Sequence, residues 1–428
     1  MAADPFDSIR RLGVWKDTVH VGTLEGDHAG RLRFTYLESA LQRPELAVSV
    51  RMPVRRKPWE DADAMVCFEN LLPEGDLRTH IAQATHMASK DVSGLLGVIG
   101  GECAGALTLW PDGVEPPASP RYEPCSTQSL GQLFDGANAQ YALLQQRTRQ
   151  AMSGAQDKVV LLRRSGDHDT HGHTVEYLLP LDGAPGTVLC KRDRGSFPGL
   201  VNNELAAMSL MERAGVPTAA HTANTLDRTI YETVRFDREV SSDGRVRRLH
   251  AEDGCQITGY TSLAKYADPR GPSYQSIMAA LRRHSADAVT DGERLLRWAI
   301  ANIVIGNRDA HAKNISILHD MNGTIRLAPA YDVICTLVYP IETMLPLPFG
   351  GHRHTKAFTT GMWRVVAREF SVTEAYAREV ADDVIVQVGT QVDDVLQRTV
   401  QIAGPHHVLT RMGDVVKAEC AQLRATLA

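Results

Sequence analysis

The pattern of apolar and polar positions changes from strand-like to helix-like along the chain. In the first hundred residues, short alternating runs are separated by turns: "LGVWKDTVHVGTLEG" (12–26) is typical of a hairpin with Asp17 in its turn, and "RLRFTYL" (31–37) of a further strand. From about Ser262 onward, apolar residues recur at helical spacing, as in "GERLLRWAIANIVIG" (292–306). The pattern predicts an α+β protein with a β-rich N-terminal part and a helical C-terminal part.

Changes in composition divide this pattern into four segments. The stretch "PDGVEPPASPRYEPCSTQS" (111–129) is rich in proline and poor in large apolar residues, which is typical of a linker or a long surface connection. Beyond it, "KVVLLRR", "VEYLLPL" and "TVLCKR" are strand-like, and "LVNNELAAMSLMERAGV" (200–216) is helix-like up to Gly215. The predicted domains are a β-rich N-terminal subdomain, a linker, a mixed α/β lobe and a helical lobe, at residues 1–112, 113–140, 141–260 and 261–428.

Charge and cysteine usage narrow the class of protein. The 428 residues carry a net charge of -5, which disfavours a protein that coats nucleic acid through its overall field. Seven scattered cysteines without a C-x-x-C motif favour reduced thiols over a disulfide framework or a zinc site. The N-terminus lacks the apolar core of a signal peptide, and no stretch approaches the roughly 20 apolar residues that span a bilayer. We therefore expect a soluble, cytoplasmic protein without a membrane partner.

A crowded polar loop carries the strongest chemical signal. "IANIVIGNRDAHAKNISIL" (300–318) places acids, bases and amides between two apolar segments. Asp309 and Asn314 have the D-x-x-x-x-N spacing of a protein-kinase catalytic loop. Phosphoryl transfer needs an acid that orients the acceptor hydroxyl and receives its proton, and oxygen ligands that hold Mg²⁺ against the phosphates. One aspartate and one asparagine on the same loop can divide these tasks.

The next segment offers a second metal ligand. Asn322-Gly323 is a hairpin signal between two short apolar runs of "ISILHDMNGTIRLAPAYDV". Folding about this turn pairs position 314 with about 331, which brings Asn314 close to Asp332. Mg²⁺ prefers one or two protein oxygens together with phosphate and water. The spacing thus predicts that Asn314 and Asp332 face one divalent ion.

Upstream residues complete the set in the order found in kinases. Lys191 ends an apolar strand-like run, as a lysine that contacts phosphate does, and Glu204 in the next helix is placed to pair with it. Ser153 and Gly154 precede the strand "VVLL", where backbone N–H groups can approach phosphate. Each feature alone has a plain structural interpretation, such as a surface lysine, a helix cap or a turn. The complete order, glycine loop, lysine, glutamate, D-x4-N, hairpin and aspartate, favours catalysis.

Other polar clusters are weaker candidates. His168, His171 and His173 lie in a polar run between strands without a cysteine or carboxylate pattern typical of zinc, which favours a solvated loop. The charges of "RFDRE" (235–239) favour structural ion pairs first and a nucleotide hinge second.

On these motifs the chain resembles the HipA-type serine/threonine kinases, the toxin half of bacterial type II toxin–antitoxin pairs. The resemblance runs nearly end to end. It rests on "FENLLPEG" and "GVIGGECAGAL" in the N-terminal part, and on "SGAQDK", "LCK", "NNELAAM", "RFDR", "LHAEDGCQ", "IGNRDAHAKNISI" and "LAPAYDV" in the remainder, in the family's order. It implies a two-lobed protein-kinase-like core with a large all-helical C-terminal lobe.

The resemblance also implies ATP and Mg²⁺ as cofactors and a role for individual residues. Asp309 would be the catalytic acid or base, and Asn314 and Asp332 would hold the metal. The other ATP-binding residues would be a phosphate loop, a phosphate-contacting lysine, a hinge strand and a histidine that lines the site: Ser153, Gly154, Ala155, Gln156, Lys158, Lys191, Val234, Arg235, Phe236 and His311.

Family members phosphorylate aminoacyl-tRNA synthetases, which stops translation and growth, and they bind a small helix-turn-helix, HipB-like antitoxin that contacts operator DNA. The resemblance therefore implies a protein substrate, an antitoxin partner and mainly indirect contact with DNA. Members also autophosphorylate a serine beside the phosphate loop. The best-known members carry this serine three residues before the glycine, where this chain has Ala151, so Ser153 is the candidate here.

Two other functions remain open at this point. A small-molecule phosphotransferase could share the same core, because the sequence does not distinguish an open acceptor surface from a closed pocket. A catalytically idle co-repressor subunit of an antitoxin–DNA complex is the second alternative. It predicts the loss of an essential polar residue, whereas Lys191, Asp309, Asn314 and Asp332 are all present.

Overall fold

The computed structural model describes residues 10–135, 138–152, 158–165, 175–193, 195, 197–266, 271–341 and 343–428. Within it the chain forms two compact units. Unit 1 comprises residues up to Cys190, together with Arg235–Glu252 and Leu318–Gly323. Unit 2 comprises Lys191–Val234, Asp253–Ile317 and Thr324–Ala428. Among the described residues, no helix is long and apolar enough to cross a membrane.

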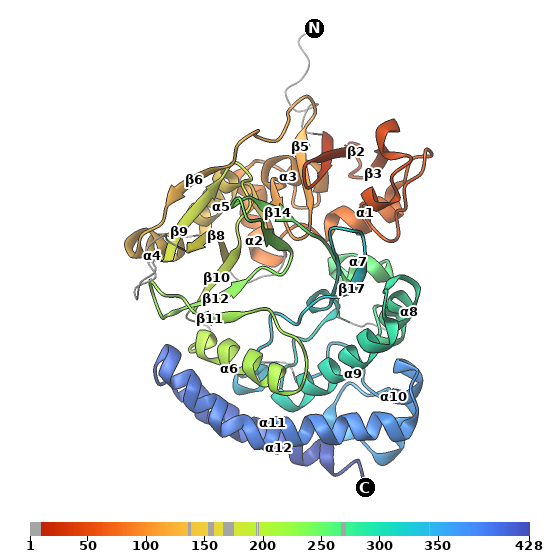
Figure 1. The fold of residues 1–428 in the computed structure, drawn as a ribbon, viewed down its shortest axis with the longest axis vertical. Helices are drawn as coiled ribbons and strands as arrows, with labels where there is room; N and C mark the ends of the chain where they lie inside the picture. The colour runs from red at the N-terminus through yellow and green to blue at the C-terminus, as the bar shows by residue number, and fades with distance from the viewer. Residues whose placement is uncertain are drawn as a thin grey trace. The chain divides into compact units, whose positions relative to one another are not determined.

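The α-helices and β-strands follow one another along the chain as Figure 1 shows. In order they are β1 (Arg11–Lys16), β2 (Val19–Gly26), β3 (Leu32–Tyr36), α1 (Asp61–Glu69), α2 (Gly75–Ala84), α3 (Val92–Ile99), β4 (Glu102–Cys103), β5 (Leu107–Pro111), β6 (Arg121–Pro124), α4 (Thr127–Asp135), α5 (Asn138–Thr148), β7 (Gln150–Ala151), β8 (Lys158–Ser165), β9 (Val175–Leu181), β10 (Val188–Arg192), α6 (Leu200–Arg213), β11 (His221–Ala223), β12 (Ile230–Val234), β13 (Arg238–Val240), β14 (Val246–Arg248), β15 (His250–Asp253), α7 (Gly254–Thr258), α8 (Tyr274–His284), α9 (Ala288–Ile305), β16 (Ser316–His319), β17 (Ile325–Leu327), α10 (Trp363–Phe370), α11 (Glu374–Ala403) and α12 (His407–Arg424).

Unit 1 is built on antiparallel strands. β3, β2, β1 and β5 form a four-stranded sheet in that order, and the predicted hairpin of β1 and β2 is confirmed, with Lys16 opposite Val19. In β3, Leu32, Phe34 and Tyr36 are buried while the residues between them are more exposed, which is the alternation of a strand with one covered face. Helices α1 and α3 pack on this sheet. Strands β6 and β8 flank β9 in a second antiparallel set.

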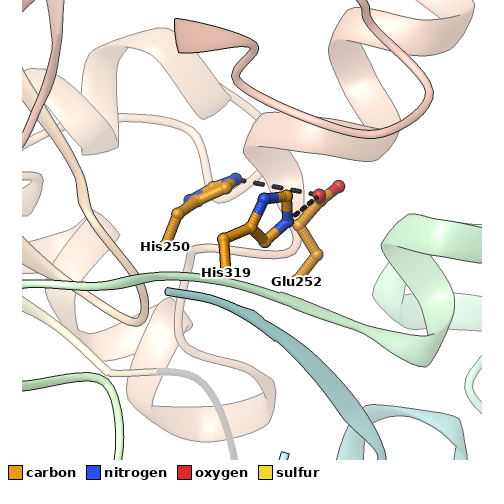
Figure 2. Close-up of side chains that lie close together, drawn as sticks. All are labelled: His250, Glu252 and His319. Carbon is orange, nitrogen blue, oxygen red and sulfur yellow. Dashed lines mark hydrogen bonds and ion pairs between the residues drawn. The ribbon is translucent and has the colours of Figure 1, made fainter. Parts of the chain in front are cut away.

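Two clusters of buried polar side chains lie inside unit 1. In the first, His250 and Glu252 of β15 meet His319 of β16, as Figure 2 shows. Nε2 of His319 lies 3.1 Å from Oε1 of Glu252. His250 and Glu252 are two residues apart on one strand, so both side chains point to the same face.

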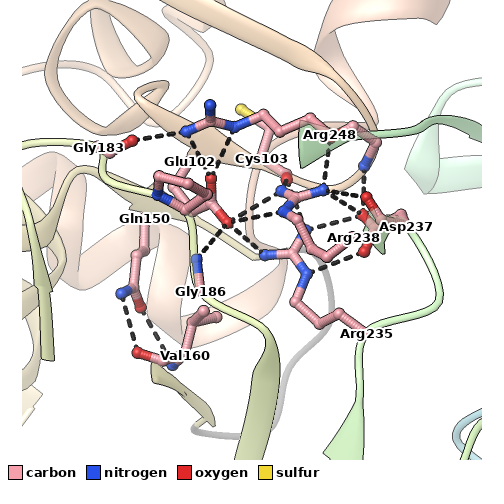
Figure 3. Close-up of polar contacts among 12 residues, drawn as sticks. Glu102, Cys103, Gln150, Val160, Gly183, Gly186, Arg235, Asp237, Arg238 and Arg248 are labelled. Atoms are coloured by element: carbon pink, nitrogen blue, oxygen red, sulfur yellow. Dashed lines mark hydrogen bonds and ion pairs between the residues drawn. The ribbon is translucent and has the colours of Figure 1, made fainter. Parts of the chain in front are cut away.

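In the second cluster, a single carboxylate binds three guanidinium groups (Figure 3). Glu102 accepts from Arg235 at 2.7 Å, from Arg238 at 2.9 Å and from Arg248 at 3.0 Å. Asp237 is the second acid, and it binds Arg235 through both of its oxygens. Burial alone would raise the pKa of Glu102, but the three positive charges outweigh burial and lower it. The structural ion pairs predicted for "RFDRE" are therefore present.

Unit 2 has a helical core, whose helices α6 to α12 are labelled in Figure 1. The long helix α11 packs against α6, α9 and α12, and α10 packs against α8 and α11. Along α11, Val380, Val384, Val388, Val392 and Val395 are buried, at the three- and four-residue spacing of one helix face. The α+β class predicted from the sequence is thus confirmed, and β16 and β17 interrupt the otherwise helical C-terminal part at the predicted hairpin.

Two local predictions differ from the structure. Residues 113–140, predicted as a linker, contain β6, all of α4 and the start of α5, and Leu130 of α4 buries its side chain in spite of the proline-rich surroundings. The pattern of "CFENLLPEGDLRTHIAQATH" (67–86) predicts a strand followed by a helix; its helix is present as α2, but its first three residues are the last turn of α1. Its apolar run is short, and such runs do not distinguish a strand from a buried helix turn. The predicted domain boundaries themselves remain predictions.

Candidate active site

The polar loop after α9 is held in place by its own side chains. Gly306 ends the helix with a φ of 81°, a left-handed conformation that glycine adopts without strain. Asn307 donates to Asn302 of α9 at 2.8 Å and accepts from the backbone N–H of Asp309 at 2.9 Å. The N–H of Arg308 donates to Thr336, and its guanidinium pairs with Glu419 of α12. The crowding of polar residues between buried segments is therefore what fixes the loop.

The loop presents the carboxylate of Asp309 to solvent. Its side chain is 50% exposed, whereas its neighbours on the loop are buried. Asn314 donates from Nδ2 to the backbone carbonyl of Asp309 at 3.0 Å. Because the amide nitrogen is used in this way, the amide oxygen of Asn314 is the atom left for a cation. The phenol of Tyr266 donates to Oδ1 of Asp309 at 2.8 Å.

His311 is a neutral neighbour of this carboxylate. Burial lowers its pKa to about 3, and the ammonium of Lys265 adds to the effect, so the imidazole carries no charge at pH 7. Its Nε2 lies 3.9 Å from Oδ1 of Asp309, and its ring meets that of Tyr266 edge to face at 5.3 Å. His311 thus packs close to Asp309 without adding a positive charge to that of Lys265.

The hairpin of β16 and β17 brings the end of the loop to the segment that carries Asp332. Ala328 donates its N–H to the carbonyl of Ser316, so position 314 lies opposite about position 330. The phenol of Tyr331 donates to the carbonyl of Lys313 at 2.6 Å, which ties the two ends of the hairpin together. Asp332 itself has a φ of 58°. This conformation is strained for a residue other than glycine, although aspartate tolerates it better than most, and such strain often occurs at functional sites.

Lys191 connects this segment to α6. Its ammonium lies 2.7 Å from Glu204 and 2.5 Å from Asp332, and the lysine is 3% exposed. Burial alone would lower the pKa of Lys191, but the charges of Asp332 and Glu204 outweigh burial and raise it, so the lysine is fully charged. Glu204 is also buried, whereas the side chain of Asp332 is 31% exposed. Glu204 thus holds the ammonium of Lys191 in place, and the carboxylate of Asp332 is accessible to a ligand.

A third segment, residues 253–256, contacts the polar loop and holds it in place. Asp253 caps α7 in a capping box with Gln256, and its other oxygen binds Lys313 at 2.5 Å. Gly254 donates its N–H to the carbonyl of Ile315, and a Cβ atom at Gly254 would lie 2.4 Å from the carbonyl oxygen of Ala312. Only glycine permits this close approach of two backbones. The motif "LHAEDGCQ" therefore positions the loop.

The structure gives less information on the other residues predicted to bind ATP. Ser153, Gly154, Ala155 and Gln156 lie outside the described residues, as do His168, His171 and His173. Lys158 is buried at the start of β8. Val234 ends β12, and Phe236 is partly exposed. The guanidinium of Arg235 is bound by Glu102 and Asp237, and its backbone N–H donates to the carbonyl of Thr187, so the side chain belongs to the buried ion-pair network. The assignment of these residues to ATP stays a prediction.

Three residues that hold the polar loop in place were missed as site residues in the sequence. Tyr266 stands in "TSLAKYADPRG" without any spacing that points to the loop 43 positions later. Asp253 and Gln256 have the D-x-x-Q spacing of a capping box, which was a usable sign of a helix start but not of the contact with Lys313.

The comparisons with known proteins agree with the motifs. The family model of the HipA N-terminal domain matches residues 12–110, and that of the HipA-like C-terminal domain matches residues 150–392. The chain belongs to the HipA family. It is 32% identical over 403 residues to Y4mE, a kinase candidate of Sinorhizobium fredii, and the match covers 92% of this chain and 93% of that protein. It is 25% identical over 287 residues to the serine/threonine-protein kinase toxin HipA of Shewanella oneidensis, a match that covers 63% of this chain and 62% of the toxin.

The HipA fold is also found in a solved structure. The chain resembles a chain in the Shewanella oneidensis complex of HipA, HipB and operator DNA with a TM-score of 0.77. The match covers 97% of this chain and 96% of that chain at 19% sequence identity. At this identity the likeness establishes the fold alone, which is the kinase-like α+β fold of the HipA proteins.

Proposed function

We propose that this HipA-family protein is an ATP- and Mg²⁺-dependent serine/threonine protein kinase. The observation that carries the proposal is the ion pair of buried Lys191 with both Glu204 and Asp332, in the same compact unit as the exposed carboxylate of Asp309. A buried cation with one accessible partner is suited to nucleotide phosphates. An exposed carboxylate on a rigid loop is suited to an acceptor hydroxyl.

The residues divide the work of phosphoryl transfer among them. Lys191 contacts the phosphates of ATP, and Glu204 holds the ammonium in position. Asn314 and Asp332 would hold Mg²⁺, which neutralises phosphate charge when bound; their amide and carboxylate oxygens are of the kind that Mg²⁺ prefers. Asp309 accepts the proton of the acceptor hydroxyl, and Tyr266 orients the carboxylate through Oδ1.

The acceptor distinguishes this proposal from its two alternatives. The purified protein is incubated with γ-labelled ATP and Mg²⁺, once with serine- and threonine-containing proteins and once with small hydroxyl metabolites. We expect label in protein only. Label in a metabolite alone would identify a small-molecule phosphotransferase, and the absence of any transfer would identify an idle co-repressor subunit.

We further propose an aminoacyl-tRNA synthetase as the substrate, with arrest of translation and growth as the consequence. Support comes from the family resemblance and from the kinase toxin among the relatives. Phosphoproteomics of host cells after induction tests it, with the Asp309→Asn protein as the control. We expect a synthetase site whose occupancy rises with the wild-type protein only. A set of wild-type-specific sites without a synthetase contradicts the proposal.

Autophosphorylation at Ser153 is proposed as the means of regulation. A phosphate adds about -1.5 to -2 charges next to the phosphates of ATP, which should displace the loop and stop the kinase. Intact-mass analysis after incubation with ATP should show one added phosphate on the wild type and none on Ser153→Ala. Equal phosphate uptake by both proteins excludes this residue.

A HipB-like antitoxin is the proposed partner, and contact with DNA is expected mainly through it. The support is the likeness to a chain solved together with HipB and operator DNA. In a gel-shift experiment, we expect operator DNA to be retarded by the antitoxin and further retarded when this protein is added. If this protein alone retards operator DNA with the same affinity as it does together with the antitoxin, indirect contact is contradicted.

A further inference from the structure

The cluster of His250, Glu252 and His319 in unit 1 has the donor set of a metal site. In the described part of the chain, it is the one group of at least three His, Cys, Asp or Glu side chains whose ligand atoms lie close enough to share an ion, all within 4.8 Å of one another. Figure 2 shows the three side chains converging from β15 and β16. None of them belongs to the proposed kinase site, whose Lys191, Asp309 and Asp332 lie in unit 2.

The distances fit a small divalent cation. Nε2 of His319 lies 3.1 Å and Nε2 of His250 lies 3.8 Å from Oε1 of Glu252. Zinc binds nitrogen and oxygen at about 2.0–2.2 Å, so neighbouring ligands of a tetrahedral ion lie roughly 3.4 Å apart. The carbonyl oxygen of Val48, 3.0 Å from Nε2 of His250, lies at a similar spacing and could serve as a fourth ligand.

The hydrogen bonds of the cluster hold its side chains in place. His250 donates from Nε2 to the carbonyl oxygen of Val48 at 3.0 Å. Its Nδ1 has no hydrogen-bond partner. With a metal on Nε2, the single ring proton moves to Nδ1. Glu252 is held by the backbone N–H of Val50 at 3.0 Å, which fixes its oxygens toward the histidines.

We propose that His250, Glu252 and His319 form a structural zinc site that joins β15 to β16. Two imidazoles with one carboxylate suit Zn²⁺ and other first-row divalent cations, whereas Mg²⁺ prefers oxygen alone. The site is therefore chemically distinct from the magnesium ligands Asn314 and Asp332.

Zinc binding by the full chain tests the proposal directly. Protein treated with a chelator is titrated with Zn²⁺ in the presence of millimolar Mg²⁺, with metal content and melting temperature as readouts. We expect one tightly bound Zn²⁺ per chain and a higher melting temperature. The absence of tight zinc uptake by the wild-type protein overturns the site.

Variants locate the metal. His319→Gln should weaken zinc binding more than about 100-fold, because even outer-shell changes typically cost 10- to 100-fold. The paired histidines outside the cluster, His406 and His407, serve as the matched control, and the double change to glutamine should leave the tight site unchanged. Wild-type affinity in His319→Gln, or loss of the tight site in the control, overturns the assignment.

A variant that removes a nearby positive charge tests the position of the ion if His319→Gln does not fold. Lys16 is half-buried, and its ammonium lies near enough to Glu252 to interact with its charge and donates to the carbonyls of Glu45 and Ala47. It competes electrostatically with a cation at the cluster. Lys16→Met retains the apolar stem and removes this charge, so it should bind Zn²⁺ about tenfold more tightly or better. Unchanged or weaker binding contradicts the proposed position of the ion.

Discussion

Replacing Asp309 with asparagine is expected to lower the rate of phosphate transfer from ATP by at least about 10²-fold, the usual contribution of a general acid or base. Asparagine keeps the shape of the side chain but does not accept the proton of the acceptor hydroxyl. Because the side chain of Asp309 is half exposed, the fold should be preserved. Transfer of label from γ-labelled ATP, normalised to circular dichroism of both proteins, measures the effect.

The matched control is an aspartate of similar exposure away from the loop. Asp393 of α11 is exposed and pairs with Lys417 of α12. Asp393→Asn should transfer phosphate at the wild-type rate. An Asp309→Asn protein as active as the wild type would remove Asp309 from the mechanism.

Replacing Glu102 with glutamine is expected to cost about 3–5 kcal/mol of the free energy of unfolding. The change removes the charge of the carboxylate that binds all three of Arg235, Arg238 and Arg248. The single negative charge of Asp237 is then left to balance three positive charges. Glu102 is fully buried, so water does not replace the lost interactions. Urea unfolding followed by circular dichroism measures the difference.

An exposed ion pair in the same unit provides the comparison. Arg33 and Glu60 lie 3.4 Å apart with more than half of each side chain exposed. Glu60→Gln should change the stability by less than about 1 kcal/mol, because exposed pairs contribute little. A loss at Glu102 no larger than that at Glu60 would show that the buried network is not a main support of unit 1.

Residues that are close in the sequence or follow a regular spacing were predicted correctly. The hairpin of β1 and β2 and the hairpin of β16 and β17 follow from alternation and turn residues. The pairing of Lys191 with Glu204 could be anticipated from a strand followed by an amphipathic helix, the familiar order in kinases. These predictions succeeded because hairpins and strand–helix pairs are specified by residues that lie close together in the sequence.

Contacts that depend on distant segments could not be obtained in this way. Tyr266 reaches Asp309 from a turn with no regular pattern, and Glu102 meets three arginines that are more than 130 positions later in the chain. The glycine-rich stretch "GVIGGECAGAL" has no Lys-Ser/Thr after its glycines, which favours tight strand packing over a phosphate loop, but nothing in it indicates that Glu102 organises the buried network. Such contacts follow from tertiary packing, which a single sequence does not display.

In the proposed mechanism, Asp332 would hold Mg²⁺ and Lys191 would contact the phosphates of ATP. Equilibrium titration with a fluorescent ATP analogue, with Mg²⁺ and then with chelator, tests it most directly. The account predicts that the wild-type protein binds the analogue about 10- to 100-fold more tightly with Mg²⁺, and that Asp332→Asn loses this difference. An Asp332→Asn protein that keeps the full dependence on Mg²⁺ would contradict the account.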